Sequence, residues 1–254
     1  MSKNSIPVLG AAIVNGAHWL HKLISSVDYP VDNFLIVNNN GKGELNEELD
    51  NLTKISHPFI KNIKVVHMPT NLGCAGAWNL IIKSYLNASY WIITSHDVSF
   101  SPGFLEEMVD KASNKDVGMV FGHEGDYGTG SYDLFLIKDW VINKIGLFDE
   151  NLYPAYCEDW DYMLRIINDP INISYNISKP YYHGGKLTYN EGGKMSMRDA
   201  SEGVRQKINN AWELNKKYMY NKWGKGWDSF SPLSEPNIKK TFDLHFRRTK
   251  HLGF

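Results

Sequence analysis

The sequence has few cysteines, almost no net charge and no long apolar run. Its two cysteines, Cys74 and Cys157, are too few for a disulfide framework and lack the spacing of a metal-binding motif. The 27 lysines and arginines balance 28 aspartates and glutamates, so no overall basic field attracts nucleic acid or an anionic membrane surface. No apolar run approaches the roughly 18 residues that a membrane-spanning helix needs. We therefore expect a cytoplasmic protein with no transmembrane segment and no nucleic-acid partner.

The residues that are present have the balance of an ordinary globular protein, with 43% hydrophobic and 22% charged residues. Short apolar segments predict strands, and residues at helical spacing lie between them. A further helix is expected to open at Ser101-Pro102, with the proline in its first turn. Strands that alternate with helices indicate an α/β fold with a mixed, mainly parallel, Rossmann-like sheet covered by helices on both faces. The expected strands are residues 8–14, 34–37, 63–67, 91–94 and 117–121.

Small or polar residues stand at four of the expected strand ends. Asparagine and glycine suit ordinary turns, which accounts for any one of these ends by itself. Because ligands of open parallel sheets bind beyond the carboxyl ends of the strands, four such ends together indicate a site. Amides can recognise a nucleobase or a ribose, and a carboxylate can hold a divalent cation against a diphosphate. The four segments are Val14-Asn15-Gly16, Asn38-Asn39-Asn40-Gly41, Pro69-Thr70-Asn71-Leu72-Gly73 and Ser95-His96-Asp97.

Three longer segments resemble motifs of one enzyme family. They are NLGCAGAWN (71–79), TSHDVSFSPGFLEEMV (94–109) and GLFDENLYPAYCEDWDYMLR (146–165). Together and in this order they resemble a family 2 glycosyltransferase with the GT-A fold, over roughly the first 180 residues. The resemblance implies transfer of a sugar from a nucleoside diphosphate sugar to a glycan acceptor, as a hexosyl- or deoxyhexosyltransferase of glycan biosynthesis.

The resemblance also implies a donor site at the strand ends. UDP is the expected nucleotide, and dTDP and GDP remain open because Asn38 stands where many members carry an aspartate that contacts the base. An amide can still donate and accept hydrogen bonds there. The residues expected to contact the donor are Val14, Asn15, Asn38, Asn40, Asn71, Gly73, Ala75, Ser95, His96 and Asp97.

A divalent cation, Mn²⁺ or Mg²⁺, is implied at the end of the fourth strand. The family usually has aspartate-x-aspartate there, whereas this chain has Ser95, His96 and Asp97. The last aspartate, which the resemblance places on the metal, is kept. His183 stands where family members often have a histidine, and its imidazole suits Mn²⁺ better than Mg²⁺. The alternative for His183 is a loop histidine that is bonded to backbone.

The acidic segment that begins at Glu158 is implied to face the acceptor. In this interpretation Asp159 is the general base of an inverting reaction, and Glu158 binds the acceptor hydroxyl. The alternative is structural, because carboxylates in the first turn of a helix stabilise its dipole, and Asp161 can pair with Arg165. Neighbouring aromatic side chains could stack on a sugar ring or pack in the core, namely Tyr153, Tyr156 and Trp160.

We expect residues 1–184 to form the GT-A catalytic core, with a donor-binding first half and an acceptor-binding second half. Residues 185–254 are expected to supply a flexible glycine-rich loop, a helix over 200–220 and a tail that packs on the core. Lys186, Lys194 and Arg198 could close over the diphosphate, or belong to an ordinary solvated loop.

Two other functions are open from the sequence. A non-catalytic module that binds a nucleotide sugar or a glycan is compatible with the loss of the first metal-motif aspartate, and it would leave Asp159 dispensable. A sugar nucleotidyltransferase would normally have a glycine-rich loop with a basic residue after the first strand, and Asn15-Gly16-Ala17-His18 does not have that form.

Overall fold

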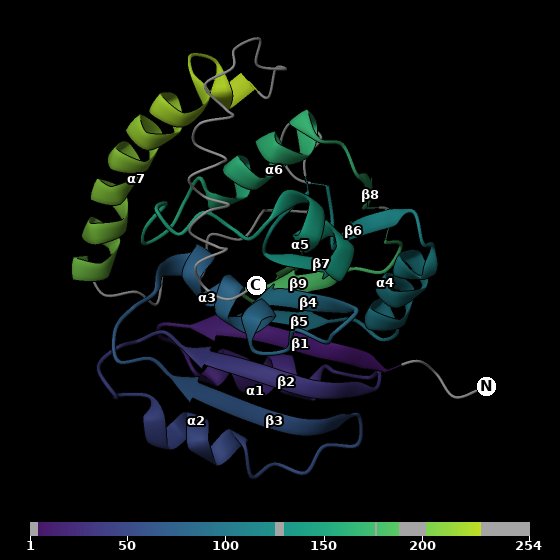
Figure 1. Ribbon diagram of the computed structural model, residues 1–254. Coiled ribbons are helices and arrows are strands. Elements are labelled where there is room, and N and C mark those ends of the chain that lie inside the picture. Colours follow the sequence, from purple (N-terminus) through teal and green to yellow (C-terminus); the bar gives the residue numbers. More distant parts are fainter. Residues whose placement is uncertain (1–4, 125–129, 176, 188–201, 230–254) are drawn as a thin grey trace.

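The main sheet of the computed structural model, which describes residues 5–124, 130–175, 177–187 and 202–229, has seven strands. Their order across the sheet is β3-β2-β1-β4-β7-β6-β8 (Figure 1). The bounds in that order are Ile60–His67, Val31–Asn38, Ile6–Ile13, Tyr90–Ser95, Leu134–Lys138, Val117–Phe121 and Asn172–Ser174.

Most neighbouring strands are parallel, which confirms the predicted fold class. The exception is β7, which pairs antiparallel with both β4 and β6. All five expected strands are present, whereas β7 was not predicted. The reversal of β7 matters for the site, because it brings the beginning of β7 beside the carboxyl end of β4.

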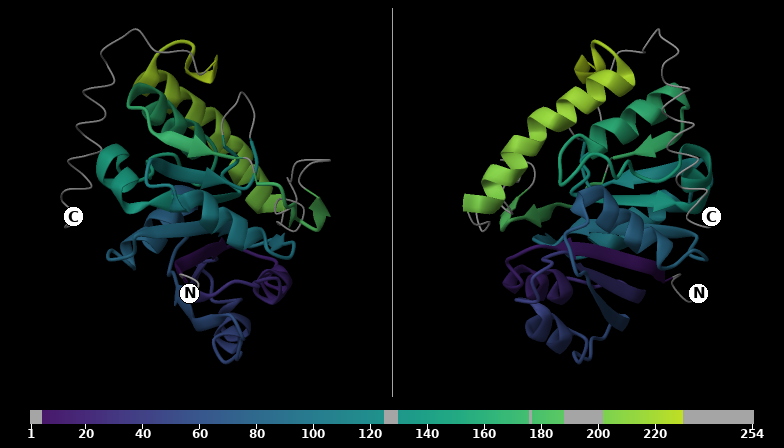
Figure 2. Two further views of the ribbon diagram at one scale, coloured as in Figure 1. Left: turned by 90° about the vertical axis from the view of Figure 1, so that its right-hand side faces the viewer. Right: turned by 60° about the vertical axis from the view of Figure 1, so that its left-hand side comes forward.

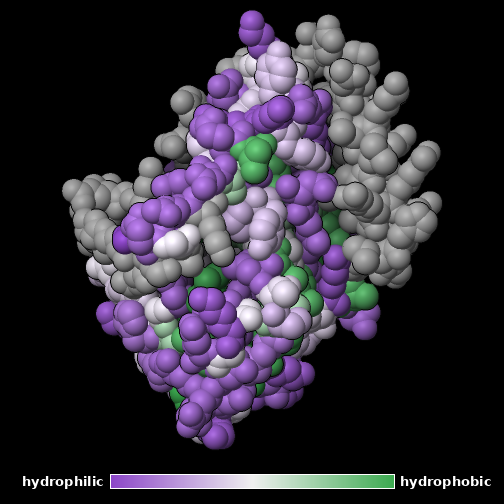
Figure 3. All heavy atoms as spheres, turned by 90° about the vertical axis from the view of Figure 1, so that its left-hand side faces the viewer, coloured by the Kyte–Doolittle hydropathy of each residue, from purple (hydrophilic) through white to green (hydrophobic). Residues whose placement is uncertain are grey.

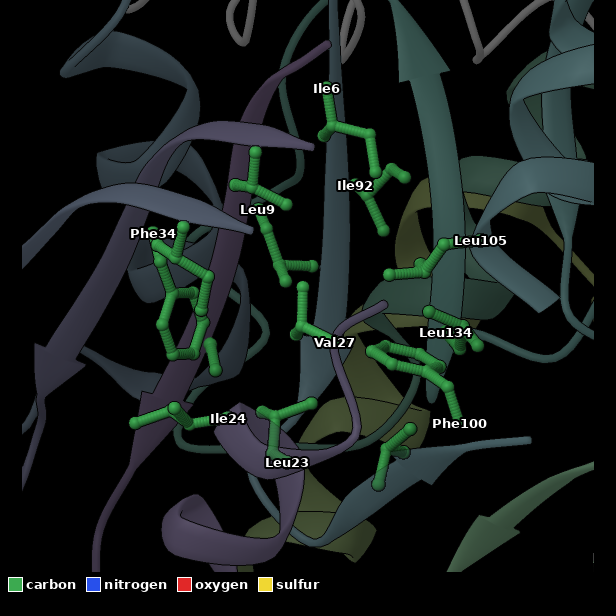
Figure 4. Packing of buried hydrophobic residues seen from close by; sticks show 14 of the residues in the cluster. Ile6, Leu9, Leu23, Ile24, Val27, Phe34, Ile92, Phe100, Leu105 and Leu134 are labelled. Carbon is green, nitrogen blue, oxygen red and sulfur yellow. The ribbon is translucent and has the colours of Figure 1, made fainter. Parts of the chain in front are cut away.

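Helices cover both faces of the sheet. On one face, the helices α1 (His18–Ser25), α2 (Asn46–Leu52) and α4 (Phe104–Ser113) bury Leu23, Leu49 and Leu105 against the strands. On the other face lie α3 (Gly73–Lys83), α5 (Asp139–Ile145) and α6 (Glu158–Asn168). Alternate strand residues point to opposite faces. Figure 4 shows Phe34 of the sheet beside Ile24 of α1, and Ile92 beside Ile6, within one buried cluster that also holds Leu9 and Leu23.

A small second sheet carries the other strands, in the order β10-β9-β5. Its members are β5 (Val98–Phe100), β9 (Tyr181–His183) and β10 (Lys186–Leu187). The prediction of a helix that opens at Ser101-Pro102 was wrong by two residues. Gly103 has a left-handed φ of 76° and caps α4, and its N–H donates to Asp28 Oδ2 at 2.6 Å, so Pro102 lies before the helix.

The helix α7 (Glu202–Trp223) and the short 3-10 helix η2 (Trp227–Ser229) follow the core. Figure 2 shows α7 beside α6, at the end of the molecule away from β3. Their contact is an apolar cluster of Leu152, Cys157, Leu164, Met219, Trp223 and Trp227. The predicted glycine-rich loop began at Gly184, but Lys186 and Leu187 form β10 and pair with β9. The rest of that loop, with Lys194 and Arg198, and the tail after 229 lie outside the described residues. In the described part of the chain, no helix combines the length and hydrophobicity that crossing a bilayer requires.

Candidate active site

Asp97 and His183 lie side by side beyond the carboxyl end of β4. His96 and Asp97 form the two-residue turn between β4 and β5, and β9 pairs with β5 so that His183 is opposite Val98. His183 Nε2 is 3.2 Å from Asp97 Oδ1. Register therefore explains why two residues 86 positions apart (183 − 97) meet.

These two side chains fit the expected divalent cation. Both carboxylate oxygens of Asp97 and Nε2 of His183 are buried, and apart from the 3.2 Å contact between Oδ1 and Nε2 they have no partner among the described residues. Buried polar atoms are nearly always fully paired, so this sparsely paired group indicates a place for a ligand. Within the described ranges, no group of three or more His, Cys, Asp or Glu side chains could hold a metal ion. Asp97 and His183 could supply two protein ligands, and diphosphate oxygens and water could complete an octahedral shell.

Two carboxylates change the charge of His183. Burial alone would lower the pKa of His183, but Asp133 and Asp97 raise it to about 10. Burial would likewise raise the pKa of Asp97, whereas His183 and then His96 hold it below its ordinary value. Without a bound cation, a protonated imidazole therefore balances the buried carboxylate charge at neutral pH.

Asp133, which the sequence interpretation missed, is the second carboxylate on His183. Its Oδ2 is 3.0 Å from His183 Nδ1 and accepts the Tyr181 hydroxyl at 2.8 Å. The N–H of Ser95 donates to its backbone oxygen at 2.7 Å. Only the pairing of β7 against β4 brings Asp133 to this position. The one local signal was a polar residue directly before an apolar run.

Asparagine side chains connect the ends of β1, β2 and β3. Asn39 Nδ2 donates to Asn71 Oδ1 and to Gly73 O, both at 3.1 Å, and its Oδ1 accepts Leu72 N–H at 2.6 Å. Asn40 Nδ2 donates to Val14 O at 2.9 Å. The strand ends that were predicted to hold the donor are thus brought together, through an Asn39 that was not among the predicted contacts.

Asn38 is also held within the protein. Its Nδ2 donates to Asn46 Oδ1 at 2.9 Å and lies 3.0 Å from His67 Nδ1, and its Oδ1 accepts Asn40 N–H at 3.2 Å. His67 in turn is 2.8 Å from Asp50. Asn38 is 2% exposed, whereas Asn15 is half-buried. Figure 3 looks at the side toward which β1, β2 and β3 point, and its visible residues are mostly hydrophilic.

The beginning of α3 touches the segment that precedes α6. Cys74 N–H donates to Pro154 O at 2.7 Å, and a Cβ at Gly73 would lie 2.9 Å from that oxygen. Gly73, with φ 77°, therefore allows both the turn and the close approach. Ala75 is buried in the first turn of α3. The segment predicted to bind the donor and the segment predicted to face the acceptor are consequently in direct contact.

Glu158 and Asp159 begin α6 after Tyr156 and Cys157, both left-handed at φ 73°. Glu158 is buried, and its Oε2 has no hydrogen-bond partner. Burial and then the neighbouring Asp159 raise the pKa of Glu158 to about 8, and the Cys74 thiol lies against it. Burial raises the pKa of Asp159 to about 6, although its Oδ1 accepts Trp160 N–H at 2.8 Å.

Asp161, two residues further along, is fully buried and fully paired. Arg165 Nε donates to it at 3.1 Å, which is the expected i,i+4 pair. Lys222 Nζ lies 2.5 Å and Trp223 Nε1 2.8 Å from its other oxygen. Lys222 also contacts Asp149 at 2.7 Å. The first and third acids of α6 therefore have opposite surroundings.

The helix α7 also supports the segment before α6. Asn215 Nδ2 donates to Ala155 O at 2.9 Å and to Tyr156 O at 3.0 Å, and the Trp212 ring lies 5.6 Å from that of Tyr156. Of the three aromatics considered for sugar stacking, Tyr153 and Tyr156 are exposed. Trp160 packs edge-on against Trp227.

A family model for "Glycosyl transferase family 2" matches residues 13–179, about two thirds of the chain. The chain belongs to glycosyl transferase family 2. It is 24% identical to a galactofuranosyl glycosyltransferase of Leishmania donovani, over 58% of this chain and 49% of that protein. The chain thus spans about half the length of this curated relative.

Solved structures of similar shape confirm that this family 2 member has the GT-A fold. A mannosyltransferase of Pyrobaculum calidifontis, in complex with GDP-Man and Mn²⁺, has a TM-score of 0.57 at 12% identity, covering 96% of this chain and 80% of that one. GalNAc-T7 with UDP, GalNAc and Mn²⁺ has a TM-score of 0.62 at 12% identity, covering 96% and 55%. S. aureus TarS with UDP-GlcNAc has a TM-score of 0.57 at 14% identity, covering 94% and 72%.

Proposed function

We propose that this family 2 member is a metal-dependent, inverting glycosyltransferase. It transfers a sugar from a nucleoside diphosphate donor, with UDP as the expected nucleotide, to a hydroxyl group of a glycan acceptor. The observation that supports this best is the Asp97–His183 pair with its sparsely paired buried atoms beyond a strand end. The structural neighbours bound to Mn²⁺ and to GDP-Man, UDP or UDP-GlcNAc add support, as does the galactofuranosyl relative, for a hexosyl or deoxyhexosyl group.

Asp97 and His183 would hold Mn²⁺, or less readily Mg²⁺, between the protein and the donor diphosphate. When bound, the cation would stabilise the negative charge that develops on the leaving diphosphate. The polar strand ends would bind the nucleoside. We keep Asn15, Asn38, Asn40 and Asn71 as donor contacts, together with Val14, Gly73, Ala75, Ser95 and His96.

The acid pair of α6 supplies a base and a hydrogen-bond donor. Burial raises the pKa of both carboxyls, so the pair holds a proton more tightly than free carboxyls would. In this proposal Glu158 holds that proton and Asp159 is ionised. Asp159 takes the proton of the acceptor hydroxyl as the oxygen attacks the anomeric carbon. The bond from that carbon to the diphosphate oxygen breaks, and its electron pair leaves with the diphosphate. Protonated Glu158 can donate a hydrogen bond to the acceptor.

Residues 1–184 would then form the catalytic core, and residues 185–254 would pack on it. The free thiols of Cys74 and Cys157 support the reducing cytoplasm as the compartment.

The test is a comparison of UDP, GDP and dTDP sugars with and without Mn²⁺, in the wild type and in Asp97→Ala. We expect Mn²⁺-stimulated release of UDP, which is lost in Asp97→Ala while the far-UV circular dichroism spectrum is kept. Binding of a donor with no turnover of any sugar would favour the binding module. Formation of pyrophosphate from a nucleoside triphosphate and a sugar phosphate would favour a nucleotidyltransferase.

A further inference from the structure

A buried carboxylate lies against the far nitrogen of the predicted metal-binding histidine. Asp133 Oδ2 is 3.0 Å from His183 Nδ1, on the opposite side of the ring from Asp97, which is 3.2 Å from Nε2. We propose that Asp133 is a positioning residue that holds the His183 ring with Nε2 directed at the cation. The inference rests on the metal-dependent function proposed above.

Asp133 is held in place by groups other than His183. The hydroxyls of Tyr181 and Ser131 donate to its two oxygens, at 2.8 Å and 2.5 Å, and its backbone oxygen accepts the N–H of Ser95. Its side chain is 10% exposed. The carboxylate therefore has a fixed orientation from which it can orient a movable ring.

The carboxylate of Asp133 determines which ring nitrogen of His183 is available to a metal ion. A neutral imidazole carries its proton on one nitrogen, and the hydrogen bond at one nitrogen decides which of the two is available to a metal. An ionised carboxylate only accepts, so the nitrogen that faces Asp133 must carry the proton. When a cation replaces the proton at Nε2, the proton that remains is the one facing Asp133, and the lone pair of Nε2 is then directed at the cation beside Asp97.

A purely structural role for Asp133 predicts a different set of effects. In that case the carboxylate would serve mainly to satisfy the hydroxyls of Ser131 and Tyr181, and any variant that disturbs this network would act alike. Tyr181→Phe separates the two roles, because it removes a hydrogen bond from Asp133 while the contact with His183 is kept.

The experiment measures the affinity for Mn²⁺ alone by electron paramagnetic resonance of the free ion, in the wild type and four variants. Asp133→Ala should lower the affinity by about 10–100-fold, the usual cost of losing an outer-shell partner of a ligating histidine. The Mn²⁺ affinity of Asp133→Asn should lie between those of the wild type and Asp133→Ala. The amide can keep its oxygen on His183 while its NH₂ group faces the Ser131 hydroxyl. Tyr181→Phe should keep wild-type affinity, and Asp97→Ala should lose binding.

The outcomes separate the two proposals. Wild-type affinity in folded Asp133→Asn and Asp133→Ala overturns the positioning role and leaves the metal site intact. An equal loss in Tyr181→Phe and Asp133→Ala also overturns it, in favour of the structural role. If Asp97→Ala binds Mn²⁺ as the wild type does, the metal site itself is misplaced. If Asp133→Ala does not fold, the isosteric Asp133→Asn still decides, since a loss of affinity in this variant that Tyr181→Phe does not share supports positioning.

Discussion

Two acid pairs lie close to the start of α6, and they differ in their partners. Asp149 and Asp161 are fully buried and share the ammonium group of Lys222. Glu158 is buried and Asp159 half-buried, neither has a cationic partner in the described part of the chain, and burial raises both pKa values. The first arrangement stabilises the fold. The second costs free energy and supplies groups that can exchange protons, as is typical of active sites.

The largest expected effect comes from neutralising the unpaired acid. Asp159→Asn should lower sugar transfer by about 10²–10⁴-fold, because an amide cannot accept the acceptor's proton. Donor binding should be unchanged. The matched control is Asp139→Asn, since Asp139 also begins a helix and accepts the N–H of a following tryptophan, at 2.7 Å. The measurement is the steady-state rate of sugar transfer by the two variants. Equal rates would mean that Asp159 only caps the helix.

The next effect should be on stability and should come from the paired acids. Lys222→Met leaves Asp149 and Asp161 buried without their shared cation, which should cost about 3–5 kcal/mol of unfolding free energy. Lys216→Met, on the same helix, removes the partly exposed pair with Glu213 and a cation–π contact 5.5 Å from the Trp212 ring, and should cost about 0.2–1 kcal/mol. Urea unfolding of both variants gives the comparison. Similar losses of unfolding free energy in the two variants would mean that the charge of Lys222 does not stabilise the buried Asp149 and Asp161 side chains.

Glu158 should make stability depend on pH in the direction typical of an uncompensated buried acid. Its pKa is raised in the folded state to about 8 from an ordinary value of 4.5, so the folded protein binds the proton more tightly than the unfolded chain. Its contribution is full below 4.5 and is lost as pH rises through about 8. Glu158→Gln should flatten the fall in unfolding free energy over this window. If the unfolding free energy of Glu158→Gln fell with pH as steeply as that of the wild type, the Glu158 carboxyl would be solvated in the folded protein.

The smallest effect should be on the metal pair, where the cation that balances Asp97 is a proton on His183. Mn²⁺ needs neutral Nε2, and the pKa of His183 is raised to about 10, so binding releases one proton below that pH. Mn²⁺ affinity should therefore rise up to about tenfold per pH unit from about pH 7 to about pH 9. His183→Ala should bind more weakly and without this slope. Electron paramagnetic resonance titrations at several pH values would detect both.

The predicted positions of Asp97, Glu158 and Asp159 depend only on local sequence. Asp97 follows an apolar strand directly, and Glu158 and Asp159 begin a helix within a contiguous motif, so local pattern is enough to place them. His183 was placed by resemblance. The fold class followed from strands that alternate with helices.

The parts that sequence did not predict depend on pairings between distant segments. Asp133 reaches His183 because β7 runs antiparallel to its neighbours, and no local pattern encodes the direction of a strand. Lys222 reaches Asp161, and Asn215 reaches Tyr156, only because α7 folds back on α6. Asn38 was expected to present its amide to a base, and its hydrogen bonds to Asn46 and Asn40 depend on loop geometry.

Asn79 of α3 joins the first half of the chain to the second. Its Nδ2 donates to Phe148 O at 2.9 Å and its Oδ1 accepts Phe148 N–H at 3.0 Å, so the side-chain amide pairs with a peptide group as a neighbouring strand would. Nδ2 also donates to Glu150 at 2.8 Å. A variant of this chain that loses the amide at position 79 leaves both polar groups of the Phe148 peptide without this partner. Asn79 therefore fixes how the segment before α6 sits against α3, which any exchange of that segment has to preserve.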